Sequence, residues 1–165
     1  MTTIKMVWAQ DKKNAIGKNG SIPWHMPDDL KLFRDETMNT LMIMGRPTWL
    51  SIGRPLPNRT SVVMTTDPSW QPNYSEVKVV RSLDEALSLI KKESRDISIA
   101  GGSIVYKAFM PYATDLVVTK IDGIIDGDTF VAPIDLSQFK LTSSEAHPKD
   151  NNHDYAYVVE RYKRK

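Results

Sequence analysis

The chain has 165 residues, of which 41% are hydrophobic, and its formal net charge is +2. A chain of this length can bury about two thirds of its unfolded surface without a metal or a disulfide, and it contains no cysteine for either purpose. The small net charge argues against nucleic acid as a partner, and no apolar run approaches the roughly 20 residues of a membrane span. We therefore expect one cytoplasmic domain over residues 1–165, with no leader peptide at Met1–Lys5 and no membrane partner.

Helical patterns occur at four places along the chain. Pro27 favours a first helical turn, and the helix that it begins is expected to run towards Met38. A short helix is expected after Pro47, and another after Gly102. Between them, Ser82–Ile90 combines an S-x-x-E capping box with one apolar helical face, which predicts a further helix.

Short runs of β-forming residues alternate with these helices. The expected strands are Ile4–Ala9, Leu41–Met44, Ser61–Thr65, Val77–Val80, Ile97–Ala100, Leu116–Ile121, Leu141–Ala146 and Tyr155–Tyr162. Several runs are continuously apolar, which indicates parallel strands buried on both faces, whereas the last two read as an antiparallel hairpin. The pattern predicts a three-layer α/β fold: a mixed, mostly parallel sheet of about eight strands, an antiparallel C-terminal hairpin and about four flanking helices.

The segment Gln10–Met26 is unusually long for a connection in a compact domain, yet it contains Ile16, Ile22 and Trp24. Its apolar residues favour a lid that closes over a ligand. A purely structural Ω-loop is the alternative.

Asp29 is the acidic residue with the strongest chemical interest. At about 100° per residue it lies about 40° from Phe33 on the expected helix, whereas Asp28 falls on the polar side. A carboxylate among apolar side chains is desolvated, which raises its pKa, and it could recognise a cationic or amidine-like edge of a ligand. A simple first-turn charge near the positive end of the helix is an equally open interpretation.

Two strand-to-helix junctions carry features that suit phosphate. The paired glycines of Ala100–Ser103 allow close backbone approach, and Met44–Trp49 brings Arg46 and Thr48 to the start of a helix. Thr65 and Thr66 could add hydroxyl donors at the next strand end. Two such junctions suggest a dinucleotide, although the spacing is not G-x-G-x-x-G and a tight packing turn at the glycines remains open.

Other chemistries find little support. His25, His147 and His153 lack metal-ligand spacing, so they are expected to be surface or loop residues and no metal site is expected. There is no G-x-S-x-G elbow. The indoles at positions 8, 49 and 70 are expected to be core or rim aromatics.

Several motifs together resemble dihydrofolate reductases, in order and over essentially the whole chain. They are Trp8–Gln10, Ile16–Gly20, Ile22–Leu30, Phe33–Arg34, Met44–Trp49, Ile52–Arg59, Ala100–Tyr106 and Gly127–Phe130. The resemblance implies NADPH-dependent reduction of 7,8-dihydrofolate to tetrahydrofolate by hydride transfer, in support of one-carbon metabolism. It also implies that antifolate-like small molecules bind. The sequence shows no exposed interaction stripe, so a monomer is the default expectation.

The resemblance assigns Asp29 as the sole active-site carboxylate, helped by Thr119, Trp24, Ile22 and an ordered water. Arg59 would pair with the α-carboxylate of the glutamate tail. The other substrate contacts would be Val7, Trp8, Ala9, Leu30, Phe33, Ile52 and Leu56.

On the cofactor side the resemblance implies that Arg46, Thr65, Thr66 and Arg81 hold the 2′-phosphate of NADPH. The remaining cofactor contacts would be Ala9, Ile16, Gly17, Gly45, Pro47, Thr48, Ala100, Gly101, Gly102, Ser103, Ile104, Val105 and Tyr106, with a cis bond between the paired glycines. Pro47 departs from the family, which often has a basic residue there. A related pteridine or pyrimidine reductase and a non-catalytic folate or nucleotide-binding module are the rival interpretations.

Overall fold

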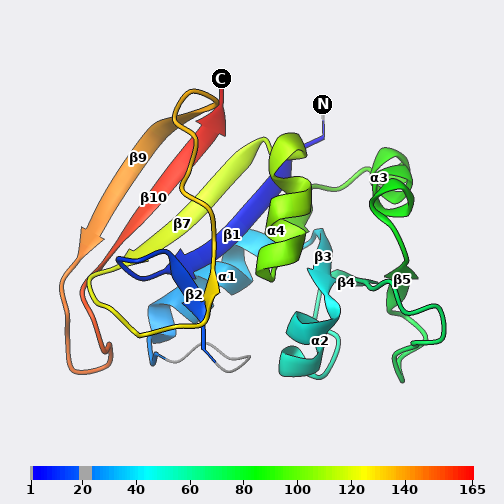
Figure 1. Cartoon of the computed structure of the whole chain (residues 1–165), viewed down its shortest axis with the longest axis horizontal. Coiled ribbons are helices and arrows are strands. Elements are labelled where there is room, and N and C mark those ends of the chain that lie inside the picture. The colour runs from blue at the N-terminus through cyan, green and yellow to red at the C-terminus, as the bar shows by residue number, and fades with distance from the viewer. Residues whose placement is uncertain (1, 19–23) are drawn as a thin grey trace.

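A computed structural model describes residues 2–18 and 24–165, and an eight-stranded sheet runs through it in the order β5-β4-β3-β6-β1-β7-β10-β9 (Figure 1). The strands of this sheet are β1 (Ile4–Gln10), β3 (Leu41–Gly45), β4 (Thr60–Met64), β5 (Lys78–Val80), β6 (Ile97–Ile99), β7 (Asp115–Ile121), β9 (Phe139–His147) and β10 (Tyr157–Arg164). All pairs are parallel except those of β10 with β7 and β9. The expected mixed sheet with an antiparallel C-terminal hairpin is therefore confirmed.

Four α-helices flank this sheet in the described part of the chain. They are α1 (Pro27–Thr37), α2 (Arg46–Ile52), α3 (Leu83–Lys92) and α4 (Ser103–Phe109), and the 3-10 helix η1 (Met110–Tyr112) follows the last of them. The capping box at α3 forms in part: the Glu85 N–H donates to Ser82 Oγ at 3.1 Å, but the Glu85 carboxylate accepts from the Arg81 N–H. None of the described helices is both long and apolar enough to cross a membrane.

The apolar side chains divide between the two faces of the sheet. Leu41 and Ile43 of β3 pack in a cluster with residues of α3 and α4, whereas Met42 and Met44 pack with Trp49 of α2. Figure 1 shows α4 in front of the sheet and α1 behind it. Because successive side chains of a strand point to opposite faces, the continuously apolar run of β3 serves both layers.

Strands β1 and β6 separate after three paired residues. Met6 pairs with Ile99, and beyond it β1 continues beside β7 alone, as far as Gln10. The chain leaves β1 towards α1 on one face and leaves β6 towards α4 on the other. We call this point the β1–β6 junction, and in open α/β sheets such a switch in direction is where ligands bind.

One strand of a small second sheet lies in Gln10–Met26, the segment that is expected from the sequence to be a lid. Strand β2 (Ala15–Gly17) pairs antiparallel with β8 (Thr129–Phe130), more than 100 positions away in the chain. Neither strand is among those expected from the sequence. The predicted lid residue Ile22 lies outside the described residues.

Candidate active site

Asp29 lies in the first turn of α1, close to the β1–β6 junction. Its N–H donates to the Met26 carbonyl at 3.0 Å, which fixes the carboxylate at the start of the helix. Burial raises the pKa of the Asp29 carboxyl, and the nearby Thr119 hydroxyl opposes that rise. The raised pKa agrees with the expectation from helical spacing.

Two buried polar groups accompany this carboxylate. Thr119 lies on β7 directly beside Ala9 of β1. Among the described residues its buried Oγ1 makes no hydrogen bond of standard geometry, although it is close enough to lower the pKa of Asp29. The indole Nε1 of Trp24, which packs in a cluster with Ala9, also has no partner among the described residues. A buried donor without a partner costs about 1–3 kcal/mol, so both groups suit a bound ligand or water.

Tyr106 of α4 closes the other side of the junction. Its hydroxyl donates to the Val7 carbonyl at 2.8 Å, at the point where β1 no longer pairs with β6. Burial, and then the negative charge of Asp29, raise the pKa of the Tyr106 phenol. Tyr106 and Asp29 therefore face the same small region from opposite sides of the sheet.

Trp8 does not share a face of β1 with Ala9. Lys5 forms an ion pair with Glu36 of α1 at 2.6 Å, so Lys5, Val7 and Ala9 face α1, by the alternation of a strand. Trp8 instead packs with the α4 cluster, and its ring lies 5.4 Å from that of Tyr106. Its side chain therefore borders the junction on the α4 face, as a core aromatic, rather than facing α1 beside Ala9.

An exposed apolar surface leads from Asp29 to a cation. Leu30 is 64% exposed although it is apolar, and Phe33, Ile52 and Leu56 pack at the edge of the α2 cluster. Arg59 donates to the Pro57 carbonyl and to Thr37 Oγ1, at 3.0 and 3.2 Å. Burial and the charge of Arg34 lower the pKa of Arg59, so an anion here would meet two guanidinium groups.

The two glycine-bearing junctions predicted from the sequence lie against one another. The Gly45 N–H donates to the Gly101 carbonyl at 2.8 Å, and the Gly101–Gly102 peptide bond is cis, as expected. A Cβ on Gly102 would meet only Thr48 Oγ1, at 3.9 Å, so the backbone there is open to a ligand. Of the residues that follow, Ile104 is 83% exposed and Val105 is buried.

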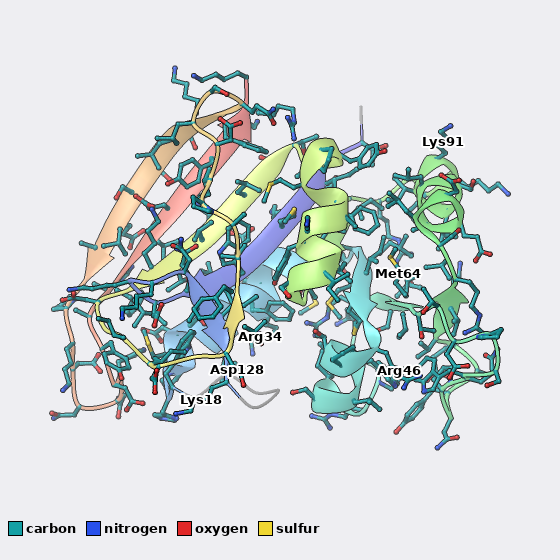
Figure 2. All side chains as sticks on the ribbon, viewed as in Figure 1. Lys18, Arg34, Arg46, Met64, Lys91 and Asp128 are labelled. Carbon is teal, nitrogen blue, oxygen red and sulfur yellow. The ribbon has the colours of Figure 1, made fainter. Side chains whose placement is uncertain are left out.

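The predicted 2′-phosphate residues gather around the segment that follows β4. Arg46 Nη1 lies 3.2 Å from Asp67 Oδ2, and Figure 2 shows Arg46 between α2 and this segment (Figure 2). Arg81 donates to the Asp67 carbonyl at 2.7 Å, and Thr65 Oγ1 accepts the Asp67 N–H at 3.3 Å. Thr66 is exposed beside them. Asp67 is not identified from the sequence, although Asp-Pro-Ser after a strand is a turn signal that could have indicated it.

One of the three histidines is not a surface residue. His153 is 6% exposed; its Nε2 accepts the Asp28 N–H at 3.2 Å, and its Nδ1 lies 2.7 Å from Asp150 Oδ1. His153 does lie in a loop, as one of the two expected alternatives had it, but its side chain is buried because this β9–β10 connection folds against the start of α1. Within residues 2–18 and 24–165 no cluster of His, Asp or Glu could hold a metal ion.

Two surface hollows lie away from Asp29 and Thr119. One is lined by residues of β7, β9 and β10, and the other by residues of β5 and α3. Neither lining includes Asp29 or Thr119, so we assign the candidate site from the chemistry of the groups at the β1–β6 junction.

Comparisons with known proteins agree with this arrangement. A family model described as dihydrofolate reductase matches residues 3–164. Dihydrofolate reductase of Bacillus subtilis (strain 168) is 38% identical over 162 residues, covering 98% of this chain and 95% of that protein. The type 3 enzyme of Salmonella typhimurium is 40% identical, with 93% of each chain covered.

Among solved structures, dihydrofolate reductase from Enterococcus faecalis complexed with NADP(H) and RAB-propyl matches with a TM-score of 0.91 and 37% identity, over 98% of this chain and 96% of that one. This chain therefore belongs to the dihydrofolate reductase family.

Proposed function

We propose that Asp29 is the carboxylate through which this chain reduces 7,8-dihydrofolate to tetrahydrofolate with NADPH. The observation that carries the proposal is its position: a half-buried acid with a raised pKa at the β1–β6 junction, beside the unpartnered Thr119 Oγ1 and Trp24 Nε1. A ligand with paired N–H donors would complete the hydrogen bonds of the Asp29 carboxylate and of Thr119 Oγ1 in a region of low dielectric, and an acceptor such as a water oxygen would complete that of the Trp24 indole N–H.

The surrounding residues fit the rest of the substrate. Val7 and Ala9 lie on the face of β1 that is turned towards α1, and the exposed Leu30 offers an apolar surface to a ring system. Phe33, Ile52 and Leu56 extend that surface towards Arg59. A guanidinium suits the carboxylate of a glutamate tail, because it can donate two parallel hydrogen bonds.

The cofactor fits on the opposite side of the junction. The open backbone at Gly102, with Thr48 and Ser103 beside it, would hold the pyrophosphate, and Arg46, Thr65, Thr66 and Arg81 would hold the 2′-phosphate. Ala9, Ala100, Tyr106 and the β2 residues Ile16 and Gly17 would surround the nicotinamide. When bound, NADPH supplies the hydride. The remaining assigned contacts are Gly45, Pro47, Gly101, Ile104 and Val105, with Ile22 outside the described residues.

The chain must also help to deliver a proton to the substrate ring. Tyr106 is a poor donor, because its hydroxyl hydrogen bonds to the Val7 carbonyl and burial raises its pKa. We infer that water delivers the proton, favoured by the negative charge of Asp29 and held by Thr119 and Trp24.

Replacement of Asp29 by Asn tests this proposal, with Asp28→Asn as a matched control because Asp28 is adjacent but 63% exposed. We expect Asp29→Asn to lower turnover by roughly 100-fold or more near neutral pH and to change NADPH affinity by less than about twofold. The control should keep its turnover. Near-normal turnover of Asp29→Asn would remove Asp29 from this role.

The same absorbance assay separates the rival functions. NADPH oxidation that requires dihydrofolate supports the reductase, whereas binding without oxidation would indicate a silent folate or nucleotide-binding module. Oxidation with another pteridine or pyrimidine alone would indicate the related reductase.

We also propose that residues 1–165 act as one monomeric domain in the cytoplasm. The support is that a single sheet contains both β1 and β10, and that a chain without cysteine suits a reducing compartment. A monomer mass in sedimentation, one cooperative unfolding transition and recovery in the cytoplasmic fraction are the expected results.

A further inference from the structure

An acidic side chain occupies the group of cations proposed above for the 2′-phosphate. Asp67 Oδ2 lies 3.2 Å from Arg46 Nη1, and both side chains are partly exposed, at 43% and 39%. Arg46 Cζ also lies 5.9 Å from the centre of the Trp70 ring. A guanidinium binds a carboxylate and a phosphate through the same N–H groups, so the two anions compete for Arg46.

Asp67 is held in this position by its own turn. Its N–H donates to Thr65 Oγ1 at 3.3 Å, and its Oδ1 accepts the Ser69 N–H and hydroxyl, at 3.0 and 2.8 Å. Arg81 donates to the carbonyls of Asp67 and Trp70, at 2.7 and 2.9 Å. The hydrogen bonds of Ser69, and then the contact with Arg46, hold the pKa of Asp67 below its ordinary value. The carboxylate is therefore ionised and already in place.

We propose that Asp67 is a specificity-determining residue that weakens the preference of this chain for NADPH over NADH. The inference rests on the proposed function, because it concerns the ribose end of the same cofactor. In dinucleotide-binding folds an acid at the ribose accepts hydrogen bonds from the 2′-hydroxyl of NAD, whereas an arginine favours the 2′-phosphate of NADP. This chain has both, in contact, so the carboxylate repels the phosphate and partly neutralises the cation that would bind it.

Asp67→Asn is the decisive variant, since an amide oxygen can still accept from Ser69 while the charge is removed. Calorimetric titration of the oxidised cofactors measures the dissociation constants of NADP⁺ and NAD⁺ without turnover. A phosphate monoester carries nearly two charges, so we expect NADP⁺ to bind about three- to tenfold more tightly and NAD⁺ to bind equally or less tightly. The gain should shrink in high salt.

Asp135 supplies a matched control. Its Oδ1 accepts the Ser137 N–H and hydroxyl, at 2.9 and 2.6 Å, in the same local turn, and no arginine contact accompanies it among the described residues. Asp135→Asn removes the same charge and should leave both dissociation constants unchanged. An unchanged ratio of NADP⁺ to NAD⁺ affinity in Asp67→Asn, or an equal change in both variants, would overturn the proposal.

Turnover of the unaltered chain separates this proposal from the proposed function. If NADPH is oxidised with dihydrofolate but the ratio of NADP⁺ to NAD⁺ affinity is the same with and without Asp67→Asn, only the inference about Asp67 fails. If neither cofactor supports turnover, the proposed function itself fails.

Discussion

Gln10 links the start of the predicted lid segment, Gln10–Met26, to the aromatic pair of Trp8 and Tyr106 at the β1–β6 junction. Its Oε1 accepts the Trp8 Nε1–H at 2.8 Å, and its Nε2 donates to Asn14 Oδ1 at 2.7 Å. Asn14 in turn has a positive φ of 64°, and its carbonyl accepts the Val131 N–H at 2.9 Å. Gln10 therefore holds Trp8 on one side and the turn before β2 on the other.

Gln10→Met keeps the length and volume of this side chain but removes both hydrogen bonds. Trp8 is 5% exposed, so its N–H would lose its partner without reaching water, at a cost of about 1–3 kcal/mol. The lost bond to Asn14 adds about 1 kcal/mol. We expect the free energy of unfolding in urea to fall by about 2–4 kcal/mol, and turnover to fall with it because the start of Gln10–Met26, the segment predicted to be a lid, loses two hydrogen bonds.

A double-mutant cycle with Trp8→Phe isolates the indole N–H. In the Trp8→Phe background the indole N–H is absent and cannot be left without a partner, so Gln10→Met should cost about 1–2 kcal/mol less than in the unaltered chain. Gln138→Met is the control, since this exposed glutamine side chain makes, among the residues that the structure describes, one hydrogen bond: its Oε1 accepts from Arg164 at 3.4 Å. The reasoning is refuted if Gln10→Met lowers the free energy of unfolding by the same amount, within about 0.5 kcal/mol, in the unaltered chain and in Trp8→Phe.

Asp29, the paired glycines and His153 each allow a direct test. Asp29 has a higher pKa in the folded chain than its ordinary value of 3.8, so the folded chain binds more protons and loses stability as the pH rises through that window. Urea unfolding should therefore give Asp29→Asn a larger free energy of unfolding than the unaltered chain at pH 7. This difference in free energy should disappear at pH values below the ordinary pKa of 3.8, and a difference that does not change with pH would contradict the prediction. Gly102→Ala should keep the unfolding midpoint but weaken NADP⁺ binding roughly tenfold or more, whereas Gly101→Ala, at φ 107° and 3.1 Å from Tyr106, should lower stability by about 1–3 kcal/mol. His153→Leu should cost about 1–3 kcal/mol because the Asp28 N–H loses its acceptor, and an unchanged melting temperature would show that this contact is dispensable.

The main sheet is well predicted from the sequence because its strands carry a strong local signal. Every residue of β3 is buried, and its continuous apolar run is visible without any tertiary information. Strand β9 is predicted from Leu141, but it begins at Phe139 and almost all of its residues after the first are exposed. Its start is set by pairing with Arg164 of β10, which local propensity does not report.

The features that the sequence did not predict depend on distant partners. Strand β2 has three residues, and it exists because Asp11 accepts the N–H groups of Ala15 and of Ile125, the second from 114 positions away. His153 is buried for the same reason, since its partner Asp28 lies 125 positions earlier. Neither contact leaves a periodic pattern in the sequence.

The candidate site shows both kinds of predictability. Helical spacing predicts Asp29 on the inner face of α1, but only the register of β1 against β7 brings Thr119 beside it. Strand alternation alone could have placed Trp8 and Gln10 on one face, and so indicated the hydrogen bond between them.

The β1–β6 junction also explains why this chain tolerates unpartnered polar groups. Where the two strands separate, polar groups lack the hydrogen-bond partners that a continuous sheet would give them. The Tyr106 hydroxyl replaces one such partner by donating to the Val7 carbonyl. Thr119 Oγ1 and Trp24 Nε1 have no protein partner of standard geometry within the described residues, and burial raises the pKa of Asp29, so the desolvation of these groups costs free energy. A ligand that completes their hydrogen bonds regains this free energy only in the bound state, and the same groups that destabilise the fold therefore select the ligand.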